Sequence, residues 1–435
     1  MSNRISRREL LTGAAAMAAA PMVVPASALG RGSKAPSERL TMGFIGVGYQ
    51  ARGHLNAFVR NEDVKVLAVC EVDTTRRNDA KKIVEDWYSN DKTYKGCDTY
   101  TDFRELVARK DIDAILIGTP DHWHCATAVA AVQNGKDVYC EKPLTLTIAE
   151  AKVLIDSVRK HKRVFQTGSQ QRSSKEFRVA CEAVRNGRIG KVQQVFVDVG
   201  GPSRPCDLPE EAMEPGLSWD MWLGQAPTRP YNSVLSPRGV HNHFPDWRSF
   251  REYSGGGMTD WGAHHFDIAQ WGLGMDESGP IEITPPEDPS KGRGVKYLYA
   301  NGVEVIHGNH KDPDGQERGG VHFVGEKGIV YVDRGQLKSW PENIVTEPLG
   351  ASETPLYKSP GHHQDWLDCI KSRKRPICDV EIGARSVTVC HLGNLAYWHG
   401  RKLKWDPAKW QFVNDHEADA WRDRERRDPW KLPKP

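Results

Sequence analysis

The chain has 435 residues, of which 27% are charged and 38% apolar, and its 60 basic and 57 acidic residues give a net charge of +3. This composition is typical of a globular protein of two or three domains, and it excludes collagen-like, coiled-coil and intrinsically disordered chains. The charges form no long block of one sign, so they do not indicate a nucleic-acid partner. The nine cysteines are an odd number without a C-x-x-C pair, which argues against a disulfide framework and a structural zinc site.

The N-terminal segment has the form of a twin-arginine (Tat) export signal. Arg7 and Arg8 precede an uncharged, alanine-rich run that extends to Gly30, and a small-residue cleavage pattern ends at Ala28. The run is long enough to span a bilayer, so a membrane anchor is the alternative, but alanine, glycine and proline make it only weakly hydrophobic. We expect a signal peptide over 1–28, a linker arm over 29–38, and a periplasmic protein that is exported folded and is free of the membrane after cleavage.

Residues 39–167 alternate short apolar runs with helical patterns, which predicts a doubly wound parallel sheet of the Rossmann type. The expected strands are Leu40–Gly46, Val64–Cys70, Ile112–Gly118, Asp137–Glu141 and Arg163–Thr167. The expected helices lie near 51–60, 75–87, 102–109, 124–134 and 147–161.

Residues 168–405 predict a second domain, of the α+β class, built on an open antiparallel sheet. Its expected strands are Lys191–Val199, Val295–Ala300, Val303–His307, Val321–Val324 and Ile329–Asp333, and Asn301-Gly302 is a hairpin turn between two of them. The Pro- and Trp-rich stretch 200–250 has the character of a functional loop region. A helix over 382–399 is long enough to pack back on the first domain, and 406–435 is expected to be a C-terminal tail.

The first expected strand runs into a dinucleotide-binding fingerprint, G-x-G-x-x-A, at Gly46, Gly48 and Ala51, with Tyr49 and Gln50 between them. Gly46 permits the tight turn, Gly48 allows the backbone to approach a pyrophosphate, and Ala51 lets the helix close on the strand. The amides at the start of the helix can then bind phosphate. The fingerprint predicts a nicotinamide dinucleotide as cofactor.

Two residues after the second strand bear on the choice between NAD and NADP. Glu71 stands where a carboxylate binds the ribose hydroxyls, and its charge repels a 2′-phosphate. Arg76 could neutralise such a phosphate and so acts in the opposite sense. We expect NAD, with NADP as the alternative.

Three further motifs follow in order. They are Thr119-Pro120 with His124 four residues later, Glu141-Lys142-Pro143, and Asp260-x-x-x-His264-x-x-Asp267 behind three glycines. Together with the fingerprint they resemble the Gfo/Idh/MocA family (glucose–fructose oxidoreductase, inositol dehydrogenase, rhizopine catabolism) over essentially the whole mature chain. The resemblance implies an oxidoreductase with its site between the two domains.

The resemblance also implies catalytic roles. Lys142 matches the lysine that bonds the reacting hydroxyl, His264 the acid/base histidine and Asp260 a carboxylate on the substrate side. The spacing i, i+4, i+7 places Asp260, His264 and Asp267 on one helical face. Asp267 could orient the imidazole or touch substrate, and the spacing does not choose between these roles.

The remaining implied roles concern the cofactor and the substrate. Glu141 matches the residue at the nicotinamide end, His124 the one that lines the cofactor ribose, and Thr119 and Pro120 lie on the cofactor side. Gln171 and Arg172 match an arginine-containing segment on the substrate side, and Arg172 could equally be a surface charge.

The expected reaction is hydride transfer between a tightly bound nicotinamide and a secondary hydroxyl of a sugar or cyclitol. The enzymatic alternative is an NAD-dependent glycosidase that oxidises C3 transiently and eliminates the leaving group. The non-enzymatic alternative is a sugar-sensing or assembly protein that has lost turnover. The resemblance also implies a homo-oligomer, a dimer or tetramer. We expect no metal, although His241 and His243 near Asp246 leave a transition-metal site open.

Overall fold

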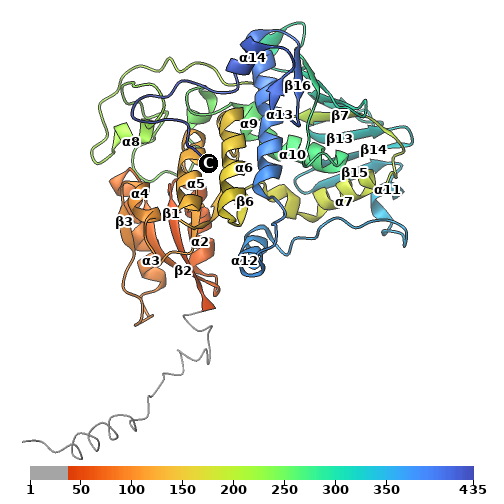
Figure 1. Ribbon diagram of the computed structural model, residues 1–435. Helices are drawn as coiled ribbons and strands as arrows, with labels where there is room; N and C mark the ends of the chain where they lie inside the picture. Colours follow the sequence, from red (N-terminus) through yellow and green to blue (C-terminus); the bar gives the residue numbers. More distant parts are fainter. Residues whose placement is uncertain (1–37) are drawn as a thin grey trace, which may run out of the picture.

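A computed structural model describes residues 38–435. The predicted signal peptide and nearly all of the predicted linker arm lie outside the described residues. Two domains lie side by side, and helix α13 (Val380–His399) stands between them (Figure 1). Within residues 38–435, no helix combines the length and the apolar character needed to cross a bilayer.

The first domain is a parallel sheet with the strand order β3-β2-β1-β4-β5-β6. Its strands are β1 (Leu40–Ile45), β2 (Val64–Cys70), β3 (Asp98–Tyr100), β4 (Ala114–Ile117), β5 (Asp137–Cys140) and β6 (Phe165–Thr167). Its helices are α2 (Tyr49–Val59), α3 (Thr74–Trp87), α4 (Phe103–Val107), α5 (Asp121–Gln133) and α6 (Ile148–His161). The Rossmann prediction is confirmed, and only the edge strand β3 was not expected, because Asp-Thr-Tyr contains no apolar run. The strand order reverses between β1 and β4, which opens a ligand crevice at the carboxyl ends of these strands.

The second domain is a nine-stranded sheet with the order β15-β14-β13-β7-β10-β9-β8-β16-β17. Its strands are β7 (Val192–Asp198), β8 (Glu282–Thr284), β9 (Lys296–Leu298), β10 (Glu304–His307), β13 (Gly320–Gly325), β14 (Gly328–Asp333), β15 (Gln336–Trp340), β16 (Leu403–Asp406) and β17 (Gln411–Phe412). A separate hairpin joins β11 (His310–Lys311) to β12 (Glu317–Arg318). The open sheet is confirmed, and its pairs are antiparallel except for β7 and β10, which run parallel.

Helices of the second domain pack on the sheet and around the cleft. They are α7 (Lys175–Arg185), α8 (Trp219–Leu223), α9 (Gly257–Asp260), α10 (Gly262–Leu273), α11 (Asn343–Thr346), α12 (His362–Ser372), α13 and α14 (His416–Ala420). Short 3-10 helices are η2 (Gln170–Ser173), η3 (Asp246–Ser249) and η4 (Pro289–Lys291). Figure 1 shows α7, α10 and α13 on the side of the sheet that faces the first domain.

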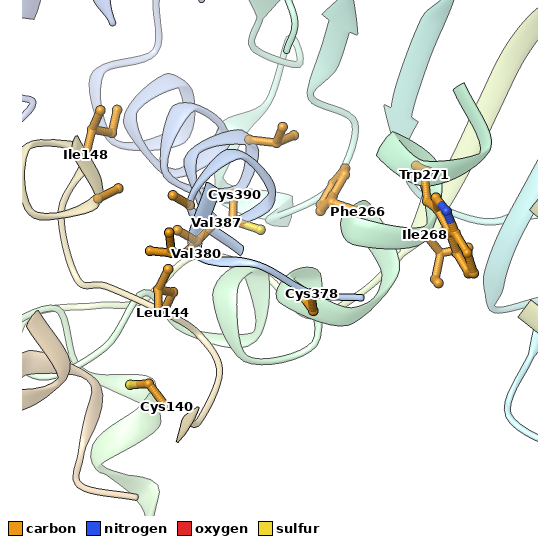
Figure 2. Close-up of a cluster of buried hydrophobic side chains, with 14 of the residues drawn as sticks. Cys140, Leu144, Ile148, Phe266, Ile268, Trp271, Cys378, Val380, Val387 and Cys390 are labelled. Atoms are coloured by element: carbon orange, nitrogen blue, oxygen red, sulfur yellow. The ribbon is translucent and has the colours of Figure 1, made fainter. Parts of the chain in front are cut away.

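Helix α13 joins the two domains into one core. Asp379 caps its first turn, and Gly400, with φ 61°, ends it. On one side His391 Nε2 lies 3.0 Å from the carbonyl oxygen of Thr145, beside α6. Figure 2 shows the apolar side chains that meet around it, which are Cys140, Leu144 and Ile148 from the first domain, Phe266, Ile268 and Trp271 from α10, and Cys378, Val380, Val387 and Cys390. Burial of this shared core fixes the position of α10 relative to the first domain.

The segment 406–435 does more than extend the chain as a tail. It contributes β17 to the sheet and then returns to the first domain, where the Arg426 guanidinium pairs with the fully buried Glu150 carboxylate at 3.0 Å. The Trp430 ring packs edge-on against Trp123, with ring centroids 4.8 Å apart. Periodicity alone could not predict this return, because the contacts join residues almost 300 positions apart.

Candidate functional site

The fingerprint forms a turn that carries backbone amides to the carboxyl end of the sheet. Gly46 has φ +75°, and a Cβ there would lie 2.7 Å from the amide nitrogen of Thr119. Gly48, the N-cap of α2, makes no side-chain capping bond, and a Cβ there would meet no atom within 4 Å. The first amides of α2 are thus exposed at a helix N-terminus beside open space, which suits a pyrophosphate.

The third position of the fingerprint sets how closely α2 approaches the sheet. Ala51 is fully buried, and a Cβ built on Gly118, just after β4, would lie 2.5 Å from the Ala51 Cβ. The backbone of α2 and the backbone after β4 therefore approach each other closely, because Ala51 faces Gly118 at this point.

Glu71 and Arg76 lie at the wall of the same crevice and make different contacts. The Glu71 carboxylate accepts hydrogen bonds from the amides of Val47, at 3.0 Å, and Asp73, at 3.1 Å. The Arg76 guanidinium instead donates to the loop 236–239, at 2.7, 3.0 and 3.1 Å, and is 7% exposed. Because Arg76 is engaged by this loop, the Glu71 carboxylate is the charged group that this wall of the crevice presents to the ribose, which favours NAD over NADP.

The crevice encloses about 870 Å³ and is lined by Gly46, Gly48, Tyr49, Gln50, Glu71, Arg76, Thr119 and Pro120. Residues of the 200–250 stretch cover it, among them Leu235, Ser236, Pro237, His241, Phe244, Trp247 and Arg248. The Tyr49 ring packs edge-on against Phe244, with ring centroids 4.9 Å apart. The Thr119 hydroxyl is buried and has no hydrogen-bond partner among the described residues. The exposed amides, the glycine turn and this unpartnered hydroxyl fit a bound dinucleotide.

A second cavity of about 1010 Å³ continues from the crevice, since Gln50, Gly118 and Thr119 line both. Lys142 from the end of β5, Asp260 from α9 and His264 from α10 meet on its walls. We call this second cavity the catalytic cleft.

Lys142 and Asp260 form the central contact of the catalytic cleft. The Lys142 ammonium donates to the Asp260 carboxylate at 2.6 Å and to the Asp260 carbonyl at 2.9 Å. Arg248 approaches the same carboxylate at 3.7 Å. Burial raises the pKa of Asp260, but the charges of Lys142 and Arg248 outweigh burial and hold that pKa below its usual range. The pair therefore presents a charged ammonium held by a carboxylate.

His264 lies beside this pair with an imidazole nitrogen, Nδ1, that is buried and has no partner among the described residues. Burial, together with the positive charges of Lys142 and Arg334, holds the pKa of His264 well below its usual range. With its side-chain amide turned so that nitrogen and oxygen exchange places, Gln171 donates to the His264 carbonyl at 3.0 Å and accepts from Arg334 Nε at 3.2 Å. The His264 imidazole is thus neutral and able to accept a proton. Gln171 contacts the backbone carbonyl of His264 and not its ring.

Glu141 reaches the wall of the catalytic cleft, and its carboxylate contacts His54 Nε2 at 2.7 Å. Burial raises the pKa of Glu141, but the hydrogen bond with His54 and the nearby charge of Lys142 lower it overall, to about 2. A Cβ on Gly168 would lie 2.8 Å from the carboxylate, so the chain needs glycine there.

Five predicted site residues line neither the crevice nor the catalytic cleft, namely Ala51, His124, Gln171, Arg172 and Asp267. Asp267 is fully buried; its carboxylate pairs with Arg172 Nε at 2.7 Å and accepts from the Ser386 hydroxyl at 2.7 Å. His124 is buried as well, and its ring nitrogens lie 2.8 and 3.0 Å from the carbonyl oxygens of Pro143 and Thr119. The geometry therefore corrects the substrate contacts expected of Asp267 and Arg172 and the ribose contact expected of His124: the first two stabilise α10 against η2 and α13, and His124 joins the two loops that bear Thr119 and Lys142.

The common helical face predicted for the acidic and histidine residues is also wrong. The helix is interrupted at Trp261, so Asp260 ends α9 and His264 belongs to α10. Seven residues of helix advance by about 10 Å along the axis, and this distance carries Asp267 past the catalytic cleft into the interface with α13. The spacing of residues in the sequence predicts which face of a helix they share, but not how far along the helix axis each one lies.

Among the residues of the catalytic cleft that were not predicted are Asp121, Arg248, Trp261 and Arg334. Asp121 follows directly after Thr119-Pro120, so its place at a helix N-terminus was a usable signal. It is 2% exposed, accepts from the Ser254 hydroxyl at 2.6 Å, and burial raises its pKa to about 7. Arg248 lies in η3 and Arg334 in the turn between β14 and β15, and neither had a signal in the sequence pattern.

The histidines considered for a metal make other contacts. His241 Nδ1 lies 2.9 Å from the His243 carbonyl oxygen, and His241 lines the crevice. Across residues 38–435, no three His, Cys, Asp or Glu side chains come together in an arrangement that could hold a metal ion.

Curated relatives match part of the chain. "Glycosyl hydrolase family 109 protein 1" of Shewanella sp. (strain ANA-3) is 30% identical over 207 residues, which are 44% of this chain and 45% of that protein. The "Alpha-N-acetylgalactosaminidase" of Shewanella oneidensis is 30% identical over 156 residues, 36% of this chain and 34% of that protein. The chain thus matches less than half the length of these relatives.

The fold has solved neighbours that span most of the chain. The WlbA dehydrogenase of Bordetella pertussis, solved with NADH and UDP-GlcNAcA, superposes with a TM-score of 0.58 at 16% identity, and the match covers 85% of this chain and 99% of the other. At this identity the likeness shows the shared fold.

Family descriptions match both domains. "Oxidoreductase family, NAD-binding Rossmann fold" matches residues 40–169, and "Oxidoreductase family, C-terminal alpha/beta domain" matches residues 202–432. The first match covers the glycine turn, Glu71 and Lys142, and the second covers Asp260 and His264, so the two halves of the site come from the two matched domains. The chain therefore belongs to the Gfo/Idh/MocA oxidoreductase family, and its first domain is an NAD-binding Rossmann domain.

Proposed function

We propose that this protein transfers a hydride between NAD and a secondary hydroxyl of a carbohydrate or cyclitol. The observation that carries the proposal is the Lys142 ammonium, bonded to Asp260 at 2.6 Å, in a catalytic cleft that continues from the dinucleotide crevice. Alcohol oxidation requires a hydride acceptor at such a junction and a group that takes the hydroxyl proton.

Lys142, Asp260 and His264 have different roles in this chemistry. NAD, when bound, supplies the hydride acceptor. Lys142 is placed to bond the reacting oxygen and to stabilise negative charge on it, while Asp260 holds the ammonium in position. His264, a neutral imidazole on the wall of the cleft, is the group placed to accept the hydroxyl proton. In the reverse direction the same groups return the proton to the oxygen.

The lining of the catalytic cleft supports a hydroxylated substrate. The Trp261 ring is 43% exposed and lies under the Arg334 guanidinium, whose carbon is 4.7 Å from the ring centroid. Gln170, Asp260 and Arg334 add polar groups to the same wall. A flat aromatic face surrounded by hydrogen-bonding groups is suited to a sugar ring.

A second candidate is glycoside cleavage assisted by redox chemistry. The 30% identity to family 109 glycosyl hydrolases supports it. Transient oxidation at C3 would acidify the C2 proton, elimination would release the leaving group, and the hydride would then return, so that the net reaction is hydrolysis. Both candidates need the same Lys142, Asp260 and His264.

One experiment distinguishes the two candidates. The purified protein is incubated with a panel of aryl glycosides, free sugars and cyclitols while NADH absorbance and released aglycone are followed together. Accumulating NADH without aglycone supports the oxidoreductase, and aglycone without NADH supports the glycosidase. Absence of both signals across the panel, from protein that binds NAD, would overturn the enzymatic proposal in favour of a sugar-binding protein.

We further propose that the protein is exported folded, through Arg7 and Arg8, and carries its cofactor to the periplasm. The cover that residues 235–248 form over the crevice supports tight retention. Denaturing the extensively dialysed protein should release NAD, and an empty protein would contradict retention. Arg7→Lys with Arg8→Lys should leave an uncleaved, folded precursor in the cytoplasm, and continued export would contradict the Tat assignment.

A homo-oligomer is the expected assembly. Helices α7 and α10 contact one face of the nine-stranded sheet. Apolar side chains that remain partly exposed alternate with buried ones along its strands, namely Phe196, Leu298, Ile306, Val324 and Ile329. A dimer or tetramer that covers them should appear in light scattering, and a monomer at micromolar concentration would contradict it.

A further inference from the structure

A row of three side chains connects the wall of the catalytic cleft with a third, outer cavity beside α2, which shares Gln50, Gln170 and Phe244 with the cleft. The Glu141 carboxylate contacts His54 Nε2 at 2.7 Å, and His54 Nδ1 lies 2.8 Å from His363 Nε2, at the start of α12. His54 and His363 line the outer cavity, of about 890 Å³, together with Arg52 and Asn56. We call Glu141, His54 and His363 the histidine row.

Glu141 is the buried acid of the histidine row. The residue is 5% exposed, and its carboxylate accepts from the Lys142 amide at 3.2 Å; burial raises its pKa, but the hydrogen bond and charge of His54, with the charge of Lys142, outweigh burial and lower that pKa. A buried carboxylate is costly unless a positive charge or donors compensate it. The Lys142 ammonium is bonded to Asp260, so the nearest group that can acquire a charge is the imidazole of His54.

The other groups around His54 do not titrate near neutral pH. Gln50, on the same helix, lies 3.3 Å from Nε2. From β5 the Tyr139 ring faces it at 5.4 Å, and burial raises the pKa of that phenol well above its usual value. From α12, burial lowers the pKa of His362 to about 4 and of His363 to about 3. A neutral His363 can donate to a neutral His54 or accept from a protonated one, by changing its tautomer.

We propose that His54 is a proton-loading site whose charge follows the oxidation state of the nicotinamide. While positively charged NAD occupies the cleft that Glu141 lines, the carboxylate has a counter-charge and His54 is neutral. When NADH, which lacks that ring charge, occupies it, His54 binds a proton and supplies the counter-charge instead. The inference rests on the proposed use of NAD and goes beyond it, because it assigns this role to a pair of histidines outside the reacting atoms.

The proton balance follows directly. Oxidation of R2CHOH moves a hydride, two electrons and one proton, to the cofactor and releases the hydroxyl proton. His54 binds one proton from solvent, for which the outer cavity offers the approach, as the ring charge disappears. His54 forms no bond with substrate carbon. Formation of the NADH complex therefore releases fewer protons to the buffer than the chemical step alone, and His54 returns its proton when NADH leaves or is reoxidised.

The test is the competition between NAD and NADH for the protein as a function of pH. Purified protein is equilibrated with mixtures of the two nucleotides between pH 6 and 9, and the bound ratio is read from NADH fluorescence and nucleotide analysis after filtration. Because the NADH complex holds the additional proton, falling pH should favour NADH, by up to about tenfold per pH unit where His54 loads fully. The His54→Asn variant should show a constant ratio, and His416→Asn, which removes an exposed imidazole on α14, should behave as the wild type.

Two further measurements keep the proposal testable if the His54→Asn variant does not fold. His363→Phe keeps the ring packing against Phe58, at 4.6 Å, but removes the acceptor for a protonated His54, so the pH dependence should move to lower pH. Imidazole ¹⁵N shifts of the histidine-labelled wild type should show one side chain that is neutral with NAD and protonated with NADH. A wild-type ratio that is independent of pH, or a dependence that survives in His54→Asn, would overturn the inference while leaving the oxidoreductase standing. Failure to bind either nucleotide would instead overturn the proposed function.

Discussion

A single methyl group at Gly118 should disturb the cofactor crevice. The added Cβ would lie 2.5 Å from the Ala51 Cβ, about 0.9 Å inside the 3.4 Å at which ordinary van der Waals contact begins. Neither carbon is the end of a flexible side chain. One is fixed to the backbone after β4, and the other to α2, so Gly118→Ala must displace the helix that presents the Gly48 amides.

The expected cost follows from this overlap. Overpacking of a well-packed site destabilises by about 1–3 kcal/mol, and the overlap here is with Ala51, which is fully buried. The free energy of unfolding should fall by that amount. The affinity for NADH should fall as well, because the displaced amides no longer face the pyrophosphate.

Chemical unfolding and NADH fluorescence titration measure the two effects. Gly53→Ala is the matched control on the same helix: its Cβ would meet nothing within 4 Å, so this variant should gain up to about 1 kcal/mol of stability. The double variant Gly118→Ala with Ala51→Gly moves the methyl group across the contact and should recover NADH affinity. Wild-type affinity in Gly118→Ala, or no recovery in the double variant, would refute the reasoning.

Three further outcomes are expected. Lys142→Met should retain NAD but lose at least about a hundredfold in kcat, since one oriented donor contributes about 2.7–4 kcal/mol; near-normal turnover would contradict its role. Arg172→Met leaves a fully buried carboxylate unpaired and should cost about 3–5 kcal/mol in urea unfolding, whereas a change below about 1 kcal/mol would contradict the ion pair. Burial raises the pKa of Asp121 to about 7, so between pH 4 and 7 the folded state holds a proton that the unfolded state has lost, and stability falls as pH rises. Asp121→Asn should therefore gain stability relative to the wild type from pH 5 to pH 8, and an equal difference at both pH values would contradict the shift.

The sequence predicted those parts of the site that depend on neighbours along the chain. Gly46, Gly48 and Ala51 are read at a strand-to-helix junction, where backbone sterics alone restrict the residue type. Lys142 lines the catalytic cleft for the same reason, since a residue at the carboxyl end of a parallel strand faces the crevice.

Contacts between distant segments were beyond such an analysis. The contact of Glu141 with His54 joins residues 87 positions apart, and neither residue type alone indicates the other. Arg76 appeared free to bind a phosphate until the loop 236–239, more than 150 residues later, occupied its guanidinium.

The sequence by itself determined the order of the two domains, the dinucleotide turn and the set of polar residues available for catalysis, because these depend on periodicity and on local backbone geometry. Only the tertiary structure decided which of those residues face the catalytic cleft. Asp260 and His264 reach it while Asp267 does not, since the interruption at Trp261 and the packing of α10 against α13 set the depth of each side chain. Sequence patterns predict which face of a helix a residue occupies. The packing of the helix in the shared core decides which residues on that face reach the ligand cavity.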